Sequence, residues 1–382
     1  MLDPIVAFFA RMLQAIRRGL GLLFVWATWP FLAAHGWYRQ RNWIIKVPVA
    51  ALLVLLVGLY GYFLVQTQSW TGFNTHYVDS YKLADRKAAG QDLAPVPVAT
   101  DAQPATTAAP KRCETSAIVD VTADLVDFNV NRNAWISSML LFKLGFFGLS
   151  WDDTPFLDNK ASFQRGVNQA VRRTSIELVD SLGRVRGTSG INSDLQNARG
   201  NLQFDESSWY FGFQPFGPKT PTPSYYRASI NSLRKFNVDL GACNATFDGR
   251  ADNLIEFIDR ISNDLGSTSD VLAERSENHN FGWFDTRADD RFWFAYGQLY
   301  GYYGILSAAG ADFSKVIAER NVGALWGDTM KQFQAALRIQ PWIVSNGRED
   351  GLIMPSHLAT MGFYILRVRS NLVETRAVLG GR

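Results

Sequence analysis

The sequence predicts an all-α protein with a single transmembrane helix, a flexible linker and a bundle-like domain of several helices. Three observations predict this architecture. One uncharged apolar run is long enough to cross a bilayer, an Ala-, Pro- and Thr-rich segment follows it, and apolar residues then recur every three or four positions. We expect four regions: a cytoplasmic basic amphipathic segment at 1–46, the transmembrane helix at 47–65, an extended linker at 66–112 and an all-helical periplasmic domain at 113–382.

Composition indicates a membrane protein with a sizeable core. Of the 382 residues, 47% are hydrophobic, which excludes a mainly disordered chain. Only 19% are charged, below the roughly 25% usual for soluble globular proteins. The chain is also generous in large aromatic residues, with 12 Trp and 26 Phe.

Positive charge is concentrated near the N-terminus. Residues 1–46 hold six Lys and Arg and one acid, whereas the remainder is close to neutral with 32 basic and 34 acidic residues. A near-neutral body lacks the basic face that replaces phosphate counterions, so we expect no nucleic-acid partner. Basic charge beside an apolar run is typical of a cytoplasmic flank.

The run Val47–Val65 contains 19 residues without a charge. At ~1.5 Å per residue it covers nearly all of a ~30 Å hydrocarbon core, so we expect it to span the bilayer. No Lys or Arg follows until Lys82, and the positive-inside rule therefore places the N-terminus in the cytoplasm. A cleaved signal peptide competes with this interpretation, but the run begins 46 residues into the chain and lacks a small-x-small cleavage site.

A second apolar stretch, Gly19–Tyr38, is uncharged for 20 residues and leaves two interpretations open. It could span the bilayer or lie in the membrane interface. Pro30 and its three tryptophans suit an interfacial helix, which is the interpretation we favour.

Two further apolar runs, 135–151 and 292–311, allow a third architecture: a multi-pass subunit of a membrane complex. For 292–311 we favour a core helix instead. Gly297, Gly301 and Gly304 fall on one helical face there and would permit another helix to approach closely.

The segment Ala88–Pro110 is rich in Ala, Pro and Thr and lacks aromatic residues. At ~3.1 Å per residue in a polyproline-like conformation it could reach several tens of ångströms. We expect it to hold the domain away from the bilayer.

Apolar patterns with a period of 3.6 predict the helices of the domain. They cover 118–128, 163–182, 191–202, 226–236 and 254–265, with two more long helices at Ser314–Ile339 and Pro355–Leu379. We expect one domain of packed helical hairpins.

No catalytic or ligand-binding motif rises above chance. The four histidines have no metal-ligand spacing, so we expect neither a metal nor a cofactor. Adjacent acids, which could act together on a glycosidic bond, occur at Asp152/Asp153, Asp205/Glu206 and Asp289/Asp290. Helix caps and solvated loops explain such pairs better. An enzyme acting on an envelope polymer through the last two pairs is the alternative to a non-enzymatic protein.

The two cysteines, Cys113 and Cys243, both fall in the part of the chain expected outside the cytoplasm. A disulfide between them would close a loop of about 130 residues and contribute ~5 kcal/mol in the chain-entropy model. Two buried free thiols are the alternative.

The Pro- and Gly-rich loop between 204 and 223 is the best candidate for a contact surface, because exposed aromatics are typical interface anchors. Its candidate partner-binding residues are Trp209, Tyr210, Phe211, Phe213 and Phe216. The alternative is that these side chains fold back into the core.

Three short motifs carry a family resemblance: the loop FDESSW at 204–209, the helix SYYRASINSL at 224–233 and RADNL at 250–254. With the basic N-terminus and the apolar run, they resemble the uncharacterised proteobacterial family catalogued as domain of unknown function 2333. We expect the resemblance to extend from about Trp43 onward. It implies a Gram-negative inner-membrane protein and brings no known activity, cofactor or catalytic residue.

We therefore expect a single-pass protein of the bacterial inner membrane with most of its chain in the periplasm. The sequence favours a non-enzymatic envelope factor whose helical domain binds a protein or cell-wall partner. The lipid bilayer is the other expected partner, and homo- or hetero-oligomerisation stays open.

Overall fold

The computed structural model describes residues 3–93, 111–146, 148–184, 190–213, 215–351 and 353–381. It is an all-α structure, as predicted, with only two small two-stranded sheets among these residues. The chain divides into two compact units, Met1–Tyr62 and Phe63–Arg382. The second unit is called the helical body below.

The first unit contains α1 (Asp3–Arg39) and most of α2 (Trp43–Gln68). By length and composition, both helices could cross a membrane: α1 over Arg11–Arg39 and α2 along its whole length. The described apolar side chains of this unit are largely exposed to solvent. The predicted span at 47–65 lies within α2, and α1 joins the basic amphipathic segment and the Trp-rich stretch in one helix.

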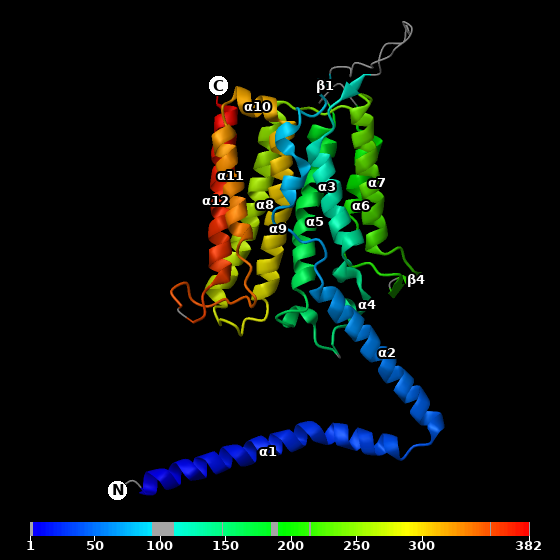
Figure 1. The fold of residues 1–382 in the computed structure, drawn as a ribbon, viewed down its shortest axis with the longest axis vertical. Coiled ribbons are helices and arrows are strands. Elements are labelled where there is room, and N and C mark those ends of the chain that lie inside the picture. The colour runs from blue at the N-terminus through cyan, green and yellow to red at the C-terminus, as the bar shows by residue number, and fades with distance from the viewer. Residues whose placement is uncertain are drawn as a thin grey trace, which may run out of the picture. The chain divides into compact units, whose positions relative to one another are not determined.

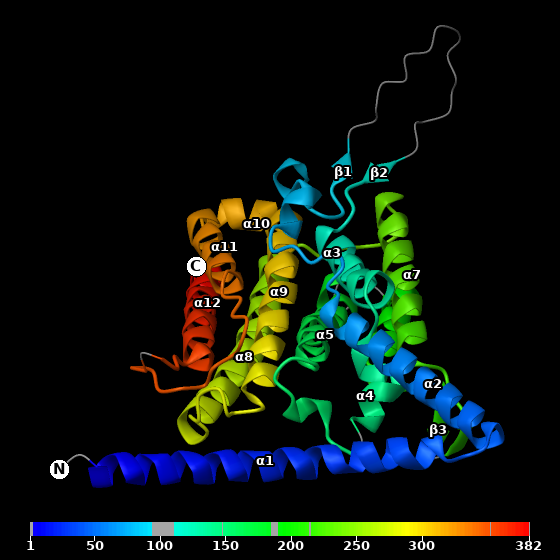
Figure 2. The ribbon, with the colours of Figure 1, turned by 60° about the horizontal axis from the view of Figure 1, so that its bottom comes forward.

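The helical body is a bundle of long helices with two distinct ends (Figure 1). Its helices are α3 (Ala117–Asp127), α4 (Leu140–Leu144), α5 (Asn159–Glu177), α6 (Ser193–Leu202), α7 (Thr222–Gly241), α8 (Ala251–Asn278), α9 (Ala288–Asp312), α10 (Ser314–Glu319), α11 (Gly323–Leu337) and α12 (His357–Gly380). We call the end at which Phe63–Gln68 enters the body the tether end. The opposite end carries α10, the C-terminus and the paired strands β1 (Asp92–Leu93) and β2 (Arg112–Cys113) (Figure 2).

Helix α9 is the centre of the body and packs against α3, α5, α8, α11 and α12. The expected core helix at 292–311 is therefore confirmed, and so is its glycine face. A Cβ on Gly297 would overlap the carbonyl oxygen of Phe163 on α5, and one on Gly166 would overlap that of Phe294. The two backbones touch because neither helix has a side chain at the crossing.

The run at 135–151 is not a continuous helix. It contains a short 3₁₀ turn at Ile136–Ser138, the five-residue α4 and a second 3₁₀ turn, η5, at Trp151–Asp153. The alternative in which 135–151 spans a membrane as one helix is therefore wrong. The long helix expected at 314–339 is likewise divided into α10 and α11, with the left-handed residue Asn321 (φ 52°) between them.

The prediction of an extended linker over 66–112 is wrong for 66–93. These residues pack against the body through two short 3₁₀ turns, Tyr77–Tyr81 and Leu83–Asp85. The ring centroid of Trp70 lies 5.0 Å from that of Phe163, and Tyr77 donates a hydrogen bond of 2.7 Å to the carbonyl of Tyr300. The reason is composition, since the segment is dense in aromatic residues that gain by burial.

The prediction that the Ala-, Pro- and Thr-rich segment lies between α2 and the helical body is wrong as well. Strands β1 and β2 pair antiparallel, with Asp92 opposite Cys113 and Leu93 opposite Arg112. The residues on either side of 94–110, a stretch outside the described residues, therefore meet in this pair of strands. This segment cannot separate α2 from the body.

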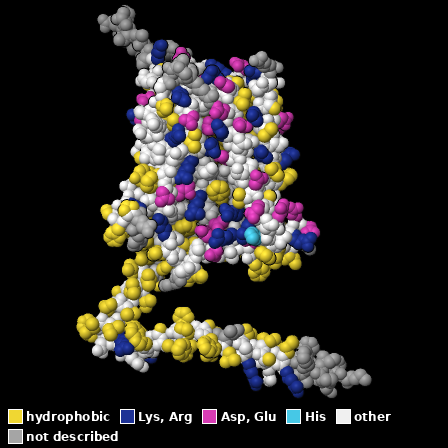
Figure 3. Space-filling model, turned by 180° about the vertical axis from the view of Figure 1, so that it is seen from behind, with side chains coloured by type: hydrophobic (Ala, Val, Ile, Leu, Met, Phe, Trp, Pro, Cys, Tyr) yellow, Lys and Arg dark blue, Asp and Glu magenta, His cyan; other side chains and the backbone are white. Residues whose placement is uncertain are grey.

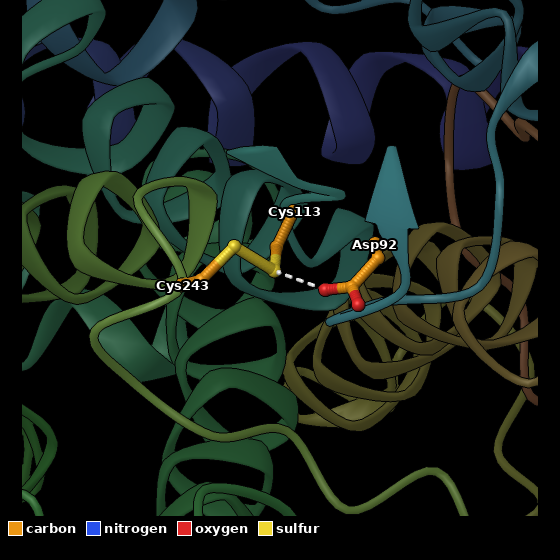
Figure 4. Close-up of a disulfide and its surroundings, with 3 residues drawn as sticks. All are labelled: Asp92, Cys113 and Cys243. Atoms are coloured by element: carbon orange, nitrogen blue, oxygen red, sulfur yellow. Dashed lines mark hydrogen bonds between the residues drawn. A yellow bond between two sulfur atoms is a disulfide. The ribbon is translucent and has the colours of Figure 1, made fainter. Parts of the chain in front are cut away.

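Cys113 and Cys243 form a disulfide that joins β2 to the residues just after α7 (Figure 4). The link bridges a sequence separation of 130 residues, with the two Cα atoms 5.3 Å apart. Asp92 Oδ1 lies 3.3 Å from Cys113 Sγ. The disulfide therefore fastens the point where residues 94–110 return to the body.

Candidate functional site

The loop predicted as a contact surface forms a β-hairpin at the tether end of the body (Figure 1). Its strands β3 (Phe211–Phe213) and β4 (Phe216–Pro218) pair antiparallel. The base of the hairpin is hydrogen-bonded to the body: Thr222 N, at the start of α7, donates to Ser208 O (3.1 Å), and Trp135 Nε1 donates to the carbonyl of Glu206 (2.7 Å). The hairpin is thus a short projection on a rigid base.

The aromatic side chains of this hairpin face solvent to different extents. Tyr210 is 64% exposed and Phe216 is 78% exposed, whereas Phe211 is 37% exposed and Trp209 is half-buried. The rings of Phe211 and Phe216 meet edge to face with centroids 4.9 Å apart. Phe213 lies in β3, and its side chain is outside the described part of the structure. Tyr210 and Phe216 have not folded back into the core.

Exposed apolar side chains from three other segments lie at the same end, and the sequence analysis did not single them out. We call this set the apolar rim: Leu144, Phe146, Leu149 and Phe156 before α5; Phe281, Trp283 and Phe284 between α8 and α9; and Trp342 and Ile353 between α11 and α12. Figure 3 shows hydrophobic side chains gathered along this edge of the body. Aromatic residues in loops between helices were the available sequence signal, because such loops are usually polar.

Phe63–Gln68, the last part of α2, is built into the body at this end. Phe63 is fully buried, with its ring centroid 4.9 Å from that of Trp151. Gln68 donates to the carbonyl of Phe156 (2.9 Å), and Lys160 Nζ donates to the carbonyl of Gln66 (2.9 Å). Desolvation lowers the pKa of Lys160 to about 8. The apolar helix therefore enters the bundle directly.

The two acid pairs considered for an enzyme lie in different surroundings. Asp205 accepts hydrogen bonds from Ser207 at the base of the hairpin, and Glu206 forms an ion pair of 2.9 Å with Arg172. Both acids have structural roles there. Asp289 and Asp290 lie instead in the first turn of α9.

Asp290 belongs to a compact group of carboxylates. One oxygen from each of Asp152, Asp158 and Asp290 lies within 4.8 Å of the other two. We call these three residues, with the neighbouring Asp289, the acid cluster. Burial, reinforced by Asp290, raises the pKa values of Asp158 and Asp289 well above the ordinary range of an aspartate.

The acid cluster does not offer an open catalytic cleft. Asp158 is fully buried and Asp289 is 4% exposed. A polymer chain cannot reach Asp158 or Asp289 in that position, although their raised pKa values resemble those of catalytic acids. The enzyme alternative therefore gains no support from this group.

A further buried acid, Glu177, lies at the opposite end of α5 from Asp158. Burial, reinforced by Glu256, raises its pKa from the ordinary 4.5 to about 7. The folded state then binds more protons than the unfolded state in that interval, so this group's contribution to stability is full below about pH 4.5 and is lost as pH rises through about 7. Glu177→Gln should stabilise the body by about 2 kcal/mol or less at pH 8 and have no such effect at pH 4.

Urea unfolding at pH 4 and pH 8 checks this expectation, with the exposed Glu374→Gln on α12 as control. An equal effect of Glu177→Gln at both pH values would contradict it.

The fold and this end of the body define a class of protein: an all-α bundle preceded by two apolar helices, with aromatic residues exposed beside the entry of the second. Residues 101–283 match the family model described as "Uncharacterized protein conserved in bacteria (DUF2333)". The predicted resemblance is thereby confirmed over residues 101–283. The match is narrower than the expected extent from Trp43 onward and ends before α9. Comparisons with curated proteins and with solved structures gave no match.

Proposed function

We propose that the protein is a membrane-anchored, non-enzymatic factor of the bacterial cell envelope that binds a protein partner at the membrane surface. The observation that carries the proposal is the hairpin with Tyr210 and Phe216 exposed on a fixed base. Exposed aromatic side chains are typical interface anchors.

The orientation of the protein follows from its charges and its disulfide. We infer that α2 spans the inner membrane, α1 lies along the cytoplasmic interface and the helical body is periplasmic. Six Lys and Arg precede the apolar run of α2, and none follows until Lys82. The Cys113–Cys243 link supports this orientation, because disulfides persist in an oxidising compartment.

The structure changes where a partner should be sought. Phe63–Gln68 is packed into the body, so the expected spacer does not lie between the apolar run and the body. The tether end then lies beside the headgroups, where Trp and Phe of the apolar rim are favourable. We therefore favour a membrane protein as partner over a distant cell-wall polymer.

Site-specific photocrosslinking tests this function. A photoreactive amino acid replaces Tyr210 or Phe216 in the full chain in native membranes. The matched control replaces Val238, an exposed apolar residue of α7 near the end of the body opposite the tether end. We expect one protein adduct from positions 210 and 216 that is absent from position 238. The double variant Tyr210→Ala with Phe216→Ala should lose co-purification of that protein and keep its helical circular dichroism.

Two outcomes would refute the hairpin assignment. Adducts with phospholipid alone would show that the hairpin lies in the bilayer. Equal protein adducts from all three positions would show collision without a specific surface.

A further inference from the structure

The acid cluster contains one polar side chain, that of Asp158, whose burial the packing of the helices does not explain. Asp158 occupies the N-cap position of α5, where an aspartate ordinarily accepts hydrogen bonds from the first backbone N–H groups. Its side chain makes no capping hydrogen bond. Asp158 is fully buried, no ordinary N–H or O–H donor is paired with its carboxylate oxygens, and the group within hydrogen-bonding reach of it is another carboxyl, that of Asp290. A buried polar group without a partner costs about 1–3 kcal/mol, and more when charged.

The oxygens around Asp158 are other carboxylates. Its oxygen lies within 4.8 Å of oxygens from Asp152 in η5 and Asp290 in α9. Asp289 is 4% exposed, and its Oδ2 also lacks a hydrogen-bond partner. Ser162 Oγ donates a hydrogen bond of 2.7 Å to Asp290 Oδ1.

The basic residues nearby do not neutralise four carboxylates. Arg287 and Arg165 act electrostatically on Asp152. Arg287 is already paired with the exposed Asp153 at 3.3 Å, and Arg165 donates to Ser137. The positive N-terminal ends of α5 and α9 contribute only partial charges. Without a cation, the group limits its negative charge by holding protons on Asp158 and Asp289, whose pKa values are raised, and a bound cation would take the place of those protons.

We propose that Asp152, Asp158 and Asp290 bind one Ca²⁺ ion. Ca²⁺ binds carboxylate oxygens at about 2.3–2.6 Å, so oxygens on opposite sides of one ion are up to about 5 Å apart. The oxygen separations in the cluster fit that limit. Mg²⁺ suits the site less well, because its shorter distances of about 2.0–2.1 Å need tighter spacing and it keeps its waters.

A bound ion at this point would have a structural effect. It would join η5 to the beginnings of α5 and α9, which are the two helices that cross at Gly166 and Gly297. Ca²⁺ binds the folded state and not the unfolded chain, so it should raise the melting temperature of the body. The site would thus fix the tether end, where the polypeptide leaves α2.

Terbium luminescence and thermal unfolding of the full chain in detergent micelles test the site. After removal of metal with EDTA, we expect saturable Tb³⁺ luminescence on tryptophan excitation, since Trp151 adjoins Asp152. Ca²⁺ should displace the Tb³⁺ and raise the melting temperature by several degrees. Asp158→Asn and Asp290→Asn should weaken Tb³⁺ binding by at least about tenfold, whereas Asp153→Asn should retain it.

The wild-type measurement keeps the proposal falsifiable even where a variant fails to fold. Absence of both saturable Tb³⁺ binding and a Ca²⁺-dependent melting temperature would overturn it and indicate that the carboxyl groups share protons. An equal loss of Tb³⁺ binding in Asp153→Asn would also overturn it, because that result indicates binding to surface charge.

Discussion

Gly297→Ala is expected to destabilise the helical body by about 3 kcal/mol. In an exposed helix the same substitution is favourable by about 1 kcal/mol, because Ala is the better helix former. At Gly297 the added Cβ overlaps the carbonyl oxygen of Phe163, so α5 and α9 must separate. Separation reduces contacts along the whole crossing, since protein interiors are close-packed. Urea unfolding followed by tryptophan fluorescence measures the loss.

Gly327→Ala on α11 is the matched control. No atom lies within 4 Å of the position that its Cβ would take, and we expect it to stabilise the protein by about 0.5–1 kcal/mol. The double variant Gly166→Ala with Gly297→Ala should lose less unfolding free energy than the sum of the losses in the two single variants. Both substitutions act on the same helix crossing, and the first one already separates the helices. Full additivity, or a stabilising effect of Gly297→Ala, would contradict this account of the packing.

The sequence was sufficient to predict features that depend on local periodicity. The apolar run of 292–311 and its row of glycines predicted the central helix and its close contact correctly, because both signals lie on one helix. The break at Asn321 was missed. A single residue in the left-handed conformation interrupts the helix there, while the apolar pattern continues on both sides.

The linker shows what local composition cannot supply. Ala, Pro and Thr content predicted a spacer between α2 and the body. Its place in the fold depends on the pairing of Asp92 with Cys113, which are 21 residues apart, and on Trp70 meeting Phe163. Neither contact is visible in the segment itself, so a spacer was predicted where the chain leaves the body and returns.

The acid cluster could not be predicted from the sequence for the same reason. Asp152 and Asp290 were each noted as members of adjacent acid pairs, but they come together only because α5 and α9 cross and bring their N-terminal ends to one place. Asp158 gave no signal, since an aspartate before a helix is usually a cap. Its burial without a capping hydrogen bond is a property of the tertiary structure alone.

Loss of the Cys113–Cys243 disulfide is expected to have the largest effect, a destabilisation of ~5 kcal/mol. The link closes a separation of 130 residues, and the entropy that it removes from the unfolded chain grows with loop length. The expected cost is comparable to the whole stability of many domains, about 5–15 kcal/mol. Cys113→Ser with Cys243→Ser should therefore melt at a much lower temperature or fail to accumulate.

Reduction of the wild-type protein separates the crosslink from the side chains. Dithiothreitol should lower the wild-type melting temperature to that of the double serine variant and leave the variant unchanged. Alkylation followed by mass spectrometry counts the thiols: none before reduction and two after it are expected for protein recovered from the membrane. Two thiols before reduction, with no effect of dithiothreitol on melting, would contradict the disulfide. That result would also remove one of the two arguments for a periplasmic body, leaving the distribution of Lys and Arg around α2 as the remaining one.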